Sequence, residues 1–139
     1  MKSKYHFSFE DLIVYQKAIE FAELVNQQIQ KFPKHESYNL SSQFQRAADS
    51  IGFNIAEGSA GSDANFNRYL QISWESVHES VCASTKARIR NYISEEENEE
   101  NRKRLSEISK MLTSLKKHLV SKIAKRKNEK QQSKHTSNL

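Results

Sequence analysis

The stretch LSSQFQRAADSIGFNIAEG, residues 40–58, has the clearest amphipathic pattern of the 139-residue chain. Apolar side chains recur in it every three or four residues, which is the spacing of one helix face: Leu40, Phe44, Ala47, Ile51 and Ile55. We therefore predict a helix over residues 40–57, with Gly58 just past its end. Gly52 falls inside this helix, where a glycine costs about 1 kcal/mol relative to alanine and often marks close helix packing.

Three more segments have helical spacing. The first begins with Ser8 as its N-cap and is stopped by Pro33, because the residue before a proline avoids helical angles. The next begins with Ser62 as its N-cap. The last opens with Ser94-x-x-Glu97, which is a capping box. It continues with a narrow apolar seam: Leu105, Ile108, Leu112, Leu115 and Leu119.

Composition and helix pattern together indicate the fold class. The chain has 3 Gly and 1 Pro, whereas a sheet protein of this size needs many turns. Four amphipathic helices joined by short loops pack most simply as an all-α, antiparallel up-down-up-down four-helix bundle. We assign residues 1–124 to this bundle. Residues 125–139 lack apolar periodicity, and we expect them to form a disordered basic tail.

The first and third predicted helices have wider apolar surfaces than one bundle seam needs. On the first helix, Phe21 and Val25 widen the apolar arc, and on the third, Ala83 and Ala87 extend a second stripe. Two explanations remain open from periodicity alone. The extra surface either thickens the core or contacts another subunit.

Motifs and composition argue against several classes of function. The single cysteine, Cys82, rules out a disulfide within the chain and fits the reducing cytoplasm. No stretch approaches the roughly 18 apolar residues of a membrane span, and no apolar leader follows Met1. Glu75 and His78 form one Glu-x-x-His, whereas a di-iron bundle needs two copies. Since no phosphate-binding glycine loop or nucleophile elbow is visible either, we expect no cofactor, no metal and no catalysis.

A line of polar residues, the polar ribbon, runs beside the apolar face of residues 40–57 at spacings of three and four: Gln43, Arg46, Ser50, Asn54 and Glu57. Glu57 lies at a helix end whose dipole disfavours an anion, so it needs a basic or donor partner. Arg68 on the third helix and a residue of a second chain are the candidates.

We interpret the ribbon, together with Arg68, as a hydrogen-bond network that fixes helix register or a subunit contact. A binding or catalytic site is the alternative. On the first interpretation, replacing Arg46 or Glu57 by alanine leaves a partly buried partner unpaired, which costs about 1–3 kcal/mol.

Several of these segments resemble a known family, the four-helix-bundle 23S ribosomal RNA intervening-sequence proteins. Its opening is similar to Phe9-Glu10-Asp11-Leu12-x-x-Tyr15-x-x-Ala18, and its central signature to Gln43-x-x-Arg46-Ala47-Ala48-x-Ser50-Ile51-x-x-Asn54-Ile55-Ala56-Glu57-Gly58. Its third helix is similar at Phe66, Arg68, Leu70, Ser76 and Glu79. The resemblance covers about residues 9–120 and leaves out the basic tail. The chain departs from the pattern at Ser59-Ala60-Gly61, which lacks an arginine, and at Ser73-Trp74-Glu75-Ser76, which replaces Ala-x-Gly-Ser.

The resemblance implies a bacterial, cytoplasmic bundle that assembles into a homopentamer and has no established enzymatic activity. It also implies a relationship to an accessory protein of diversity-generating retroelements, which engages nucleic acid and a reverse transcriptase.

The charge pattern suggests nucleic acid as a partner. The net charge is +5, and residues 125–139 contribute +4 of it, from five basic residues and one acid. Because phosphate contacts depend on summed charge, repetition of basic side chains in an oligomer would favour binding with little sequence specificity. The candidate contacts lie on the last two helices and in the tail: Arg88, Arg90, Lys103, Arg104, Lys110, Lys116, Lys117, Lys125, Arg126, Lys127, Lys130 and Lys134.

Two alternatives to nucleic-acid binding remain open. The basic residues of the fourth helix could be neutralised locally, since Glu99–Lys103, Glu100–Arg104 and Glu107–Lys110 stand at helical spacings. The oligomer could instead present a surface to a protein partner, as a scaffold or accessory subunit.

Overall fold

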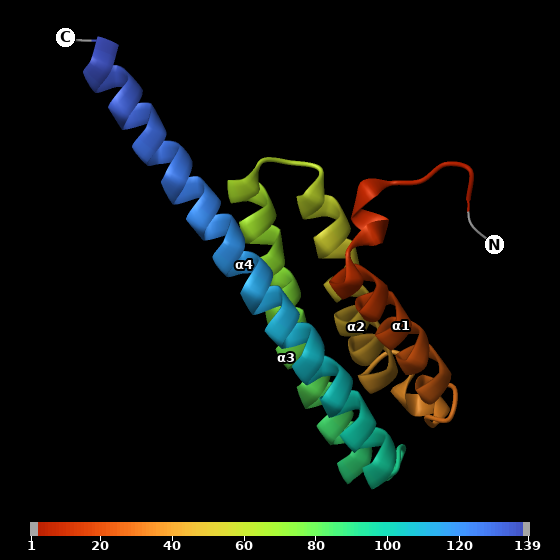
Figure 1. The fold of residues 1–139 in the computed structure, drawn as a ribbon. Helices are drawn as coiled ribbons and strands as arrows, with labels where there is room; N and C mark the ends of the chain where they lie inside the picture. Colours follow the sequence, from red (N-terminus) through yellow and green to blue (C-terminus); the bar gives the residue numbers. More distant parts are fainter. Residues whose placement is uncertain (1–2, 138–139) are drawn as a thin grey trace.

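The computed structural model describes residues 3–137 as four α-helices joined by short connections (Figure 1). These helices are α1 (Ile13–Ile29), α2 (Leu40–Ser59), α3 (Asp63–Ile89) and α4 (Glu95–Ser137). Helices that follow one another in the sequence pack together as antiparallel neighbours, and α1 also contacts α4. The described residues contain no strand. The predicted all-α four-helix bundle is confirmed.

The core contains the apolar faces that periodicity predicts. The predicted face of α2 is buried throughout, with Phe44, Ile51 and Ile55 fully enclosed. The seam of α4 is buried at Leu105, Ile108, Leu112 and Leu119, whereas Leu115 is half-buried. One continuous cluster therefore joins all four helices.

The first helix is shorter than predicted at both ends. Ser8 is not the N-cap of α1, because Ser8–Asp11 forms a separate 3₁₀ turn before it. In that turn the Glu10 carboxylate accepts the backbone N–H of Phe7 at 3.0 Å. At the other end α1 stops at Ile29, and Pro33 precedes a second 3₁₀ turn, Lys34–Glu36. Bonds between residues three apart satisfy the backbone at both ends, which a pattern of apolar spacing does not reveal.

The two glycines of α2 both mark close packing between helices. A β-carbon on Gly52 would lie 3.1 Å from the Cδ1 atom of Ile19 in α1. Gly58 belongs to α2 and is buried, so its predicted place after the helix end is wrong. A β-carbon there would lie 2.6 Å from the Cβ atom of Tyr69 in α3, closer than real β-carbons approach. Gly58 therefore allows α2 and α3 to meet near their connection.

The predicted caps of the last two helices are confirmed. The Ser62 hydroxyl accepts the backbone N–H of Asn65 at 3.2 Å at the start of α3. At the start of α4 the Ser94 hydroxyl accepts the N–H of Glu97, and the Glu97 carboxylate accepts the N–H of Ser94, each at 3.0 Å. Both capping patterns satisfy N–H groups that have no partner within their helix.

The fourth helix is longer than predicted. Residues 125–137, which we expected to be disordered, continue α4 as a helix. They contain no Gly or Pro and are rich in Lys, Arg and Gln, which favour helices. Arg126 also pairs with Asp63 of α3 at 2.6 Å, so a tertiary contact holds the start of this segment. Residues 138–139 of the predicted tail lie outside the described residues.

Within residues 3–137, no helix combines the length and the apolar character that crossing a bilayer requires.

Candidate functional site

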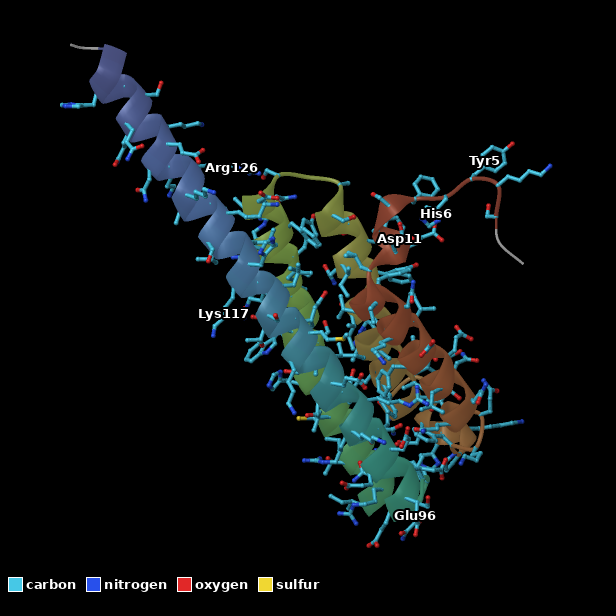
Figure 2. All side chains as sticks on the ribbon, viewed as in Figure 1. Tyr5, His6, Asp11, Glu96, Lys117 and Arg126 are labelled. Carbon is cyan, nitrogen blue, oxygen red and sulfur yellow. The ribbon has the colours of Figure 1, made fainter. Side chains whose placement is uncertain are left out.

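Charge is strongly segregated along α4. Residues 95–107 contain six acids and three bases, a net charge of −3. Residues 108–137 contain nine Lys and Arg and one acid, Glu129, a net charge of +8. Figure 2 shows the two ends far apart, with Glu96 at one end of the bundle and Arg126 near the other. We call residues 108–137 the basic half of α4.

Four of the basic candidates are engaged within the fold. Arg90 donates at 2.5 Å to Glu36, whose buried carboxylate lies in the connection after α1. Arg104 pairs with Glu100 at 3.1 Å and Arg126 with Asp63. Lys116 donates to Gln71, and its ammonium group lies 5.4 Å from the centre of the Trp74 ring. Arg90, Lys116 and Arg126 therefore connect separate elements, whereas the Arg104 pair lies within α4.

The other eight candidates make no side-chain hydrogen bond or ion pair with any residue in the described part of the chain: Arg88, Lys103, Lys110, Lys117, Lys125, Lys127, Lys130 and Lys134. All but Arg88 are exposed. Lys117 points away from the bundle (Figure 2). Six of the eight, all except Arg88 and Lys103, lie in the basic half of α4, so this segment keeps most of its charge available.

Ion pairs between neighbouring residues of α4 neutralise few of its basic side chains. Of the three predicted pairs along α4, only Glu100–Arg104 forms. Glu107 instead pairs across the bundle with Lys17 of α1 at 2.9 Å, and this hydrogen bond lowers the pKa of the Glu107 carboxyl. Lys103 and Lys110 are left without the ion pairs that their spacing suggests.

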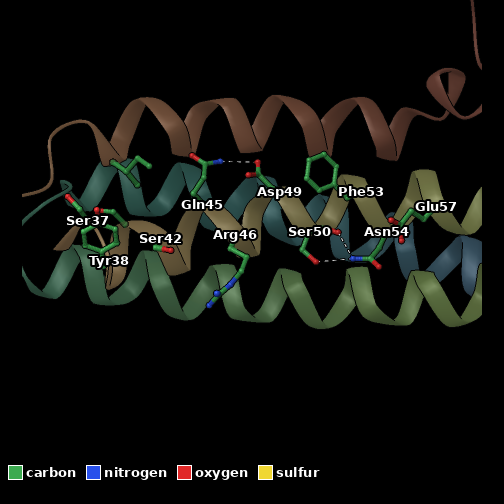
Figure 3. Close-up of a pocket in the computed structure, with 12 residues that line it drawn as sticks. Ser37, Tyr38, Ser42, Gln45, Arg46, Asp49, Ser50, Phe53, Asn54 and Glu57 are labelled. Carbon is green, nitrogen blue, oxygen red and sulfur yellow. Dashed lines mark hydrogen bonds between the residues drawn. The ribbon is translucent and has the colours of Figure 1, made fainter.

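The polar ribbon borders a shallow groove of about 620 Å³ along the outer face of α2 (Figure 3). At its centre the predicted network exists: Asn54 donates to the hydroxyl and the carbonyl oxygen of Ser50, at 2.9 and 2.8 Å. Ser76 of α3 donates to the Ser50 hydroxyl at 2.9 Å. This part of the ribbon therefore fixes the register of α2 against α3.

The charged members of the ribbon do not join that network. Arg46 and Glu57 are exposed, and neither side chain makes a hydrogen bond or ion pair within residues 3–137. Gln43 is exposed as well. Arg68, the predicted partner of Glu57, instead donates to Asn65 at 3.2 Å and lies over the Tyr69 ring. In the single chain, alanine at Arg46 or Glu57 would therefore leave no buried partner unpaired.

Two aromatic side chains beside the groove are unusually exposed. Tyr38 is 97% exposed and Phe53 is 61% exposed. Both line the same groove as Arg46 and Glu57 (Figure 3). Large apolar side chains gathered on one face with charged neighbours are typical of contact surfaces between proteins.

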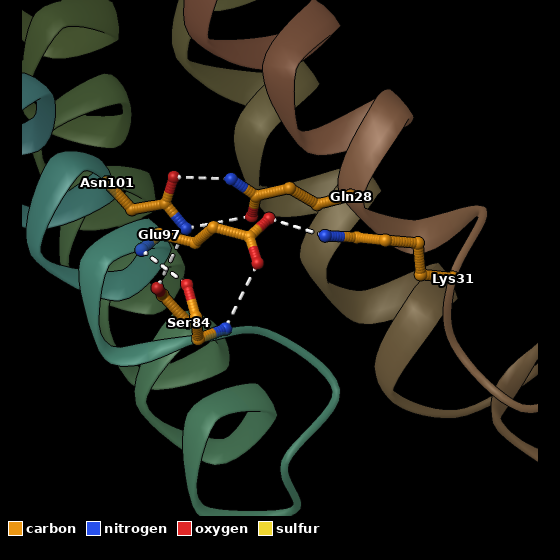
Figure 4. A network of polar contacts seen from close by, with 6 residues as sticks. Gln28, Lys31, Ser84, Glu97 and Asn101 are labelled. Carbon is orange, nitrogen blue, oxygen red and sulfur yellow. Dashed lines mark hydrogen bonds and ion pairs between the residues drawn. The ribbon is translucent and has the colours of Figure 1, made fainter.

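A buried polar network was missed by the sequence analysis (Figure 4). Gln28 of α1 and Asn101 of α4 exchange two side-chain hydrogen bonds, both 2.9 Å. Asn101 also donates to Ser84 of α3 at 3.0 Å, and Ser84 donates to Asn98 at 2.8 Å. Asn98 and Asn101 precede Leu105 at spacings of three and four, so polar residues at seam positions were the available signal.

The Glu75-x-x-His78 pair forms no metal site in the described chain. His78 Nδ1 lies 2.9 Å from the carbonyl oxygen of Trp74. Among residues 3–137, no three His, Cys, Asp or Glu side chains are grouped so that they could hold a metal ion. Cys82 is exposed.

Comparison with known proteins supports the family resemblance. A family model described as 23S rRNA-intervening sequence protein matches residues 10–114. The chain is also similar to a crystal structure, at 1.70 Å resolution, of a protein from the S23 ribosomal protein family of Bacteroides thetaiotaomicron VPI-5482. The TM-score is 0.68 at 30% sequence identity, and the match covers 76% of this chain and 99% of that chain. No curated protein matches the sequence.

The family match spans the first three helices and α4 as far as Ser114, and it stops before most of the basic half. Because it covers well over half of the sequence and agrees with the four-helix fold, this chain belongs to the family of 23S rRNA-intervening sequence proteins.

Proposed function

We propose that the protein is a non-enzymatic, homo-oligomeric bundle that associates with nucleic acid in the bacterial cytoplasm with little sequence specificity. The observation that carries this proposal is the net charge of +8 on residues 108–137, most of whose bases have no partner in the fold. Summed positive charge of this kind attracts phosphate backbones. Since the segment contains no Phe, Tyr or Trp, we expect charge and not base stacking to dominate binding there.

Oligomerisation is proposed from the outer face of α2. Tyr38 and Phe53 leave apolar area in water, and Arg46 and Glu57 on the same face have no side-chain partner among residues 3–137. A second copy that covers this groove would bury the aromatic rings and supply charged partners. The pentamer implied by the family resemblance would present the basic half of α4 five times, which strengthens phosphate binding through avidity.

The direct test combines nucleic-acid titration with a mass measurement. Filter binding of RNA and duplex DNA at increasing salt should show affinity that falls steeply, because bound phosphates release counterions. Light scattering at micromolar protein should give a multiple of the 16.1 kDa chain mass. Absence of binding at low salt would overturn the nucleic-acid part, and a monomeric mass would overturn the assembly.

The second candidate is a scaffold that binds a protein partner, favoured by the same aromatic groove. A Tyr38→Ser, Phe53→Ser variant separates the two uses of this surface. A lower mass than that of the parent chain would assign the groove to contacts between copies. An unchanged mass would leave the groove open to another protein.

A further inference from the structure

The end of α4 projects beyond the bundle (Figure 1). Asp63 is the first residue of α3, and it pairs with Arg126, so residues 127–137 extend past the end of the neighbouring helix. At 1.5 Å per residue this projecting end is about 16 Å long, or three turns. Lys122 also approaches Asp63, at 3.9 Å, so the base of the projection is held by two basic residues and one carboxylate.

No core residue stabilises the projecting end. No apolar residue follows Ala124 up to Ser137, and the side chains from Lys125 to His135 are exposed. A short helix that is polar on all sides is marginal in water when it stands alone. The segment is therefore a helix that would gain stability from a partner of opposite charge.

Its lysines have a regular arrangement. Lys127, Lys130 and Lys134 follow at spacings of three and four, so they form a line on one face of the helix. Lys125 lies on roughly the opposite face. Stabilisation of the helix dipole does not explain this arrangement, because that effect falls off within the last turn and the lysines span about two and a half turns.

We propose that the projecting end of α4 docks in the major groove of duplex DNA, with Lys127, Lys130 and Lys134 facing the phosphates of one strand. This inference rests on the proposed nucleic-acid function and names its target. A helix with side chains is about 10–12 Å wide, and the major groove of B-form DNA is about 12 Å wide. Lys125 then faces the other wall of the groove.

Other nucleic acids fit this helix less well. The major groove of A-form RNA is deep and narrow and does not admit side chains from a helix. Single strands are usually held by aromatic side chains on which bases stack, and residues 108–137 contain no Phe, Tyr or Trp. Insertion in a membrane surface needs an apolar helix face, which residues 125–137 also lack.

The first experiment removes the line of lysines without changing helix propensity. We would titrate the full chain into a labelled 30-base-pair DNA duplex, the matching RNA duplex, the single strands and vesicles of anionic lipid. The variant Lys127→Gln, Lys130→Gln, Lys134→Gln should bind the DNA duplex at least about tenfold more weakly, with a salt slope shallower by about 3. The control Lys4→Gln, Lys34→Gln, Lys86→Gln removes the same charge from other exposed lysines and should bind nearly as the parent chain does.

The second experiment breaks the helix without changing the charge. Proline at Asn128 removes a backbone hydrogen bond and clashes with the preceding turn, whereas alanine there keeps the helix. We expect Asn128→Pro to weaken duplex DNA binding about tenfold or more and Asn128→Ala to leave it unchanged. Equal binding by both variants would mean that a flexible basic arm suffices, which would overturn the groove-docking proposal.

The outcomes separate this inference from the proposed function. Equal affinity for single strands, RNA duplex and DNA duplex would overturn docking in the groove while leaving nucleic-acid association intact. Preference for anionic vesicles over every nucleic acid would overturn both. Affinity for the DNA duplex about tenfold above that for the RNA duplex and the single strands would support the inference, if this difference is lost in the triple lysine variant and in Asn128→Pro.

Discussion

The first part of α4, residues 95–119, and its second part, residues 120–137, belong to one unbroken helix but are stabilised in different ways. Up to Leu119 the helix buries a regular seam and places Asn101 in a polar network with α1 and α3. Among residues 120–135, Ile123 is half-buried and the others are exposed, and Lys122 and Arg126 pair with Asp63 of α3.

This difference shows where helix stability comes from. Tertiary packing stabilises the first part, whereas the second part depends on local helix propensity and a few surface charges. The second part should therefore open far more readily than the first. It also carries four of the seven α4 lysines that lack a partner in the described chain: Lys125, Lys127, Lys130 and Lys134.

The largest expected effect tests the first part of α4. Asn101→Ala should lower the free energy of unfolding by about 3 kcal/mol or more, because Gln28 and Ser84 both lose buried hydrogen bonds. Urea unfolding followed by circular dichroism measures this change.

A paired substitution sharpens that result. In the variant Gln28→Leu, Asn101→Leu both partners of the amide pair are apolar, and the Ser84–Asn98 bond can persist. Its free energy of unfolding should be much closer to that of the parent chain than the free energy of unfolding of Asn101→Ala is. Equal loss in the two variants would mean that packing at this position, and not unpaired polar groups, sets the cost.

A smaller effect is expected where residues 120–137 of α4 meet the bundle. Asp63→Asn removes the carboxylate that pairs with Lys122 and Arg126, and it should cost about 1 kcal/mol, as surface ion pairs do. Hydrogen exchange should become faster in residues 120–137 and stay slow around Leu105 and Leu112. Faster exchange along the whole of α4 would contradict the separation of its two parts.

A pH-dependent effect comes from the first part of α4. A hydrogen bond from Lys31 lowers the pKa of the Glu97 carboxyl below its ordinary value. Because the folded-state pKa is below the unfolded one, the stabilisation is present above the unfolded pKa and is lost as the pH falls through the folded pKa. As the pH falls from about 5 to 3, the Lys31→Met variant should therefore lose about 0.5 kcal/mol less of its free energy of unfolding than the parent chain does. Parallel curves for the two chains would show that the pair contributes nothing to folding.

The smallest expected effect is that of truncation. Ending the chain after Lys127 keeps both contacts with Asp63 and exposes no core, so the melting temperature should stay within about 1 °C of that of the full chain. Ending it after Ala124 also removes Arg126 and should give a slightly lower value. If the chain cut after Lys127 unfolds, residues 128–137 make stabilising contacts, for example between copies.

Much of the fold was predictable because helices are encoded by local patterns. The spacing of Phe44, Ile51 and Ile55 predicted the buried face of α2, and Ser62 and Ser94 predicted two helix starts. The centre of the polar ribbon at Ser50 and Asn54 was also predictable, since residues four apart on a helix meet. The extension of α4 was not, because absence of an apolar pattern was interpreted as disorder.

The sequence by itself determined the helices, their order and the faces that form the core, because these depend on residues three and four apart. Only the tertiary structure decided the partners of polar residues that are far apart in the chain. Glu107 pairs with Lys17 and not with Lys110, and Asn101 meets Gln28, 73 residues away. Such partners depend on how helices are placed against one another, and a one-dimensional pattern does not contain that placement. For the same reason, only the structure showed that the basic end of α4 stands clear of the bundle.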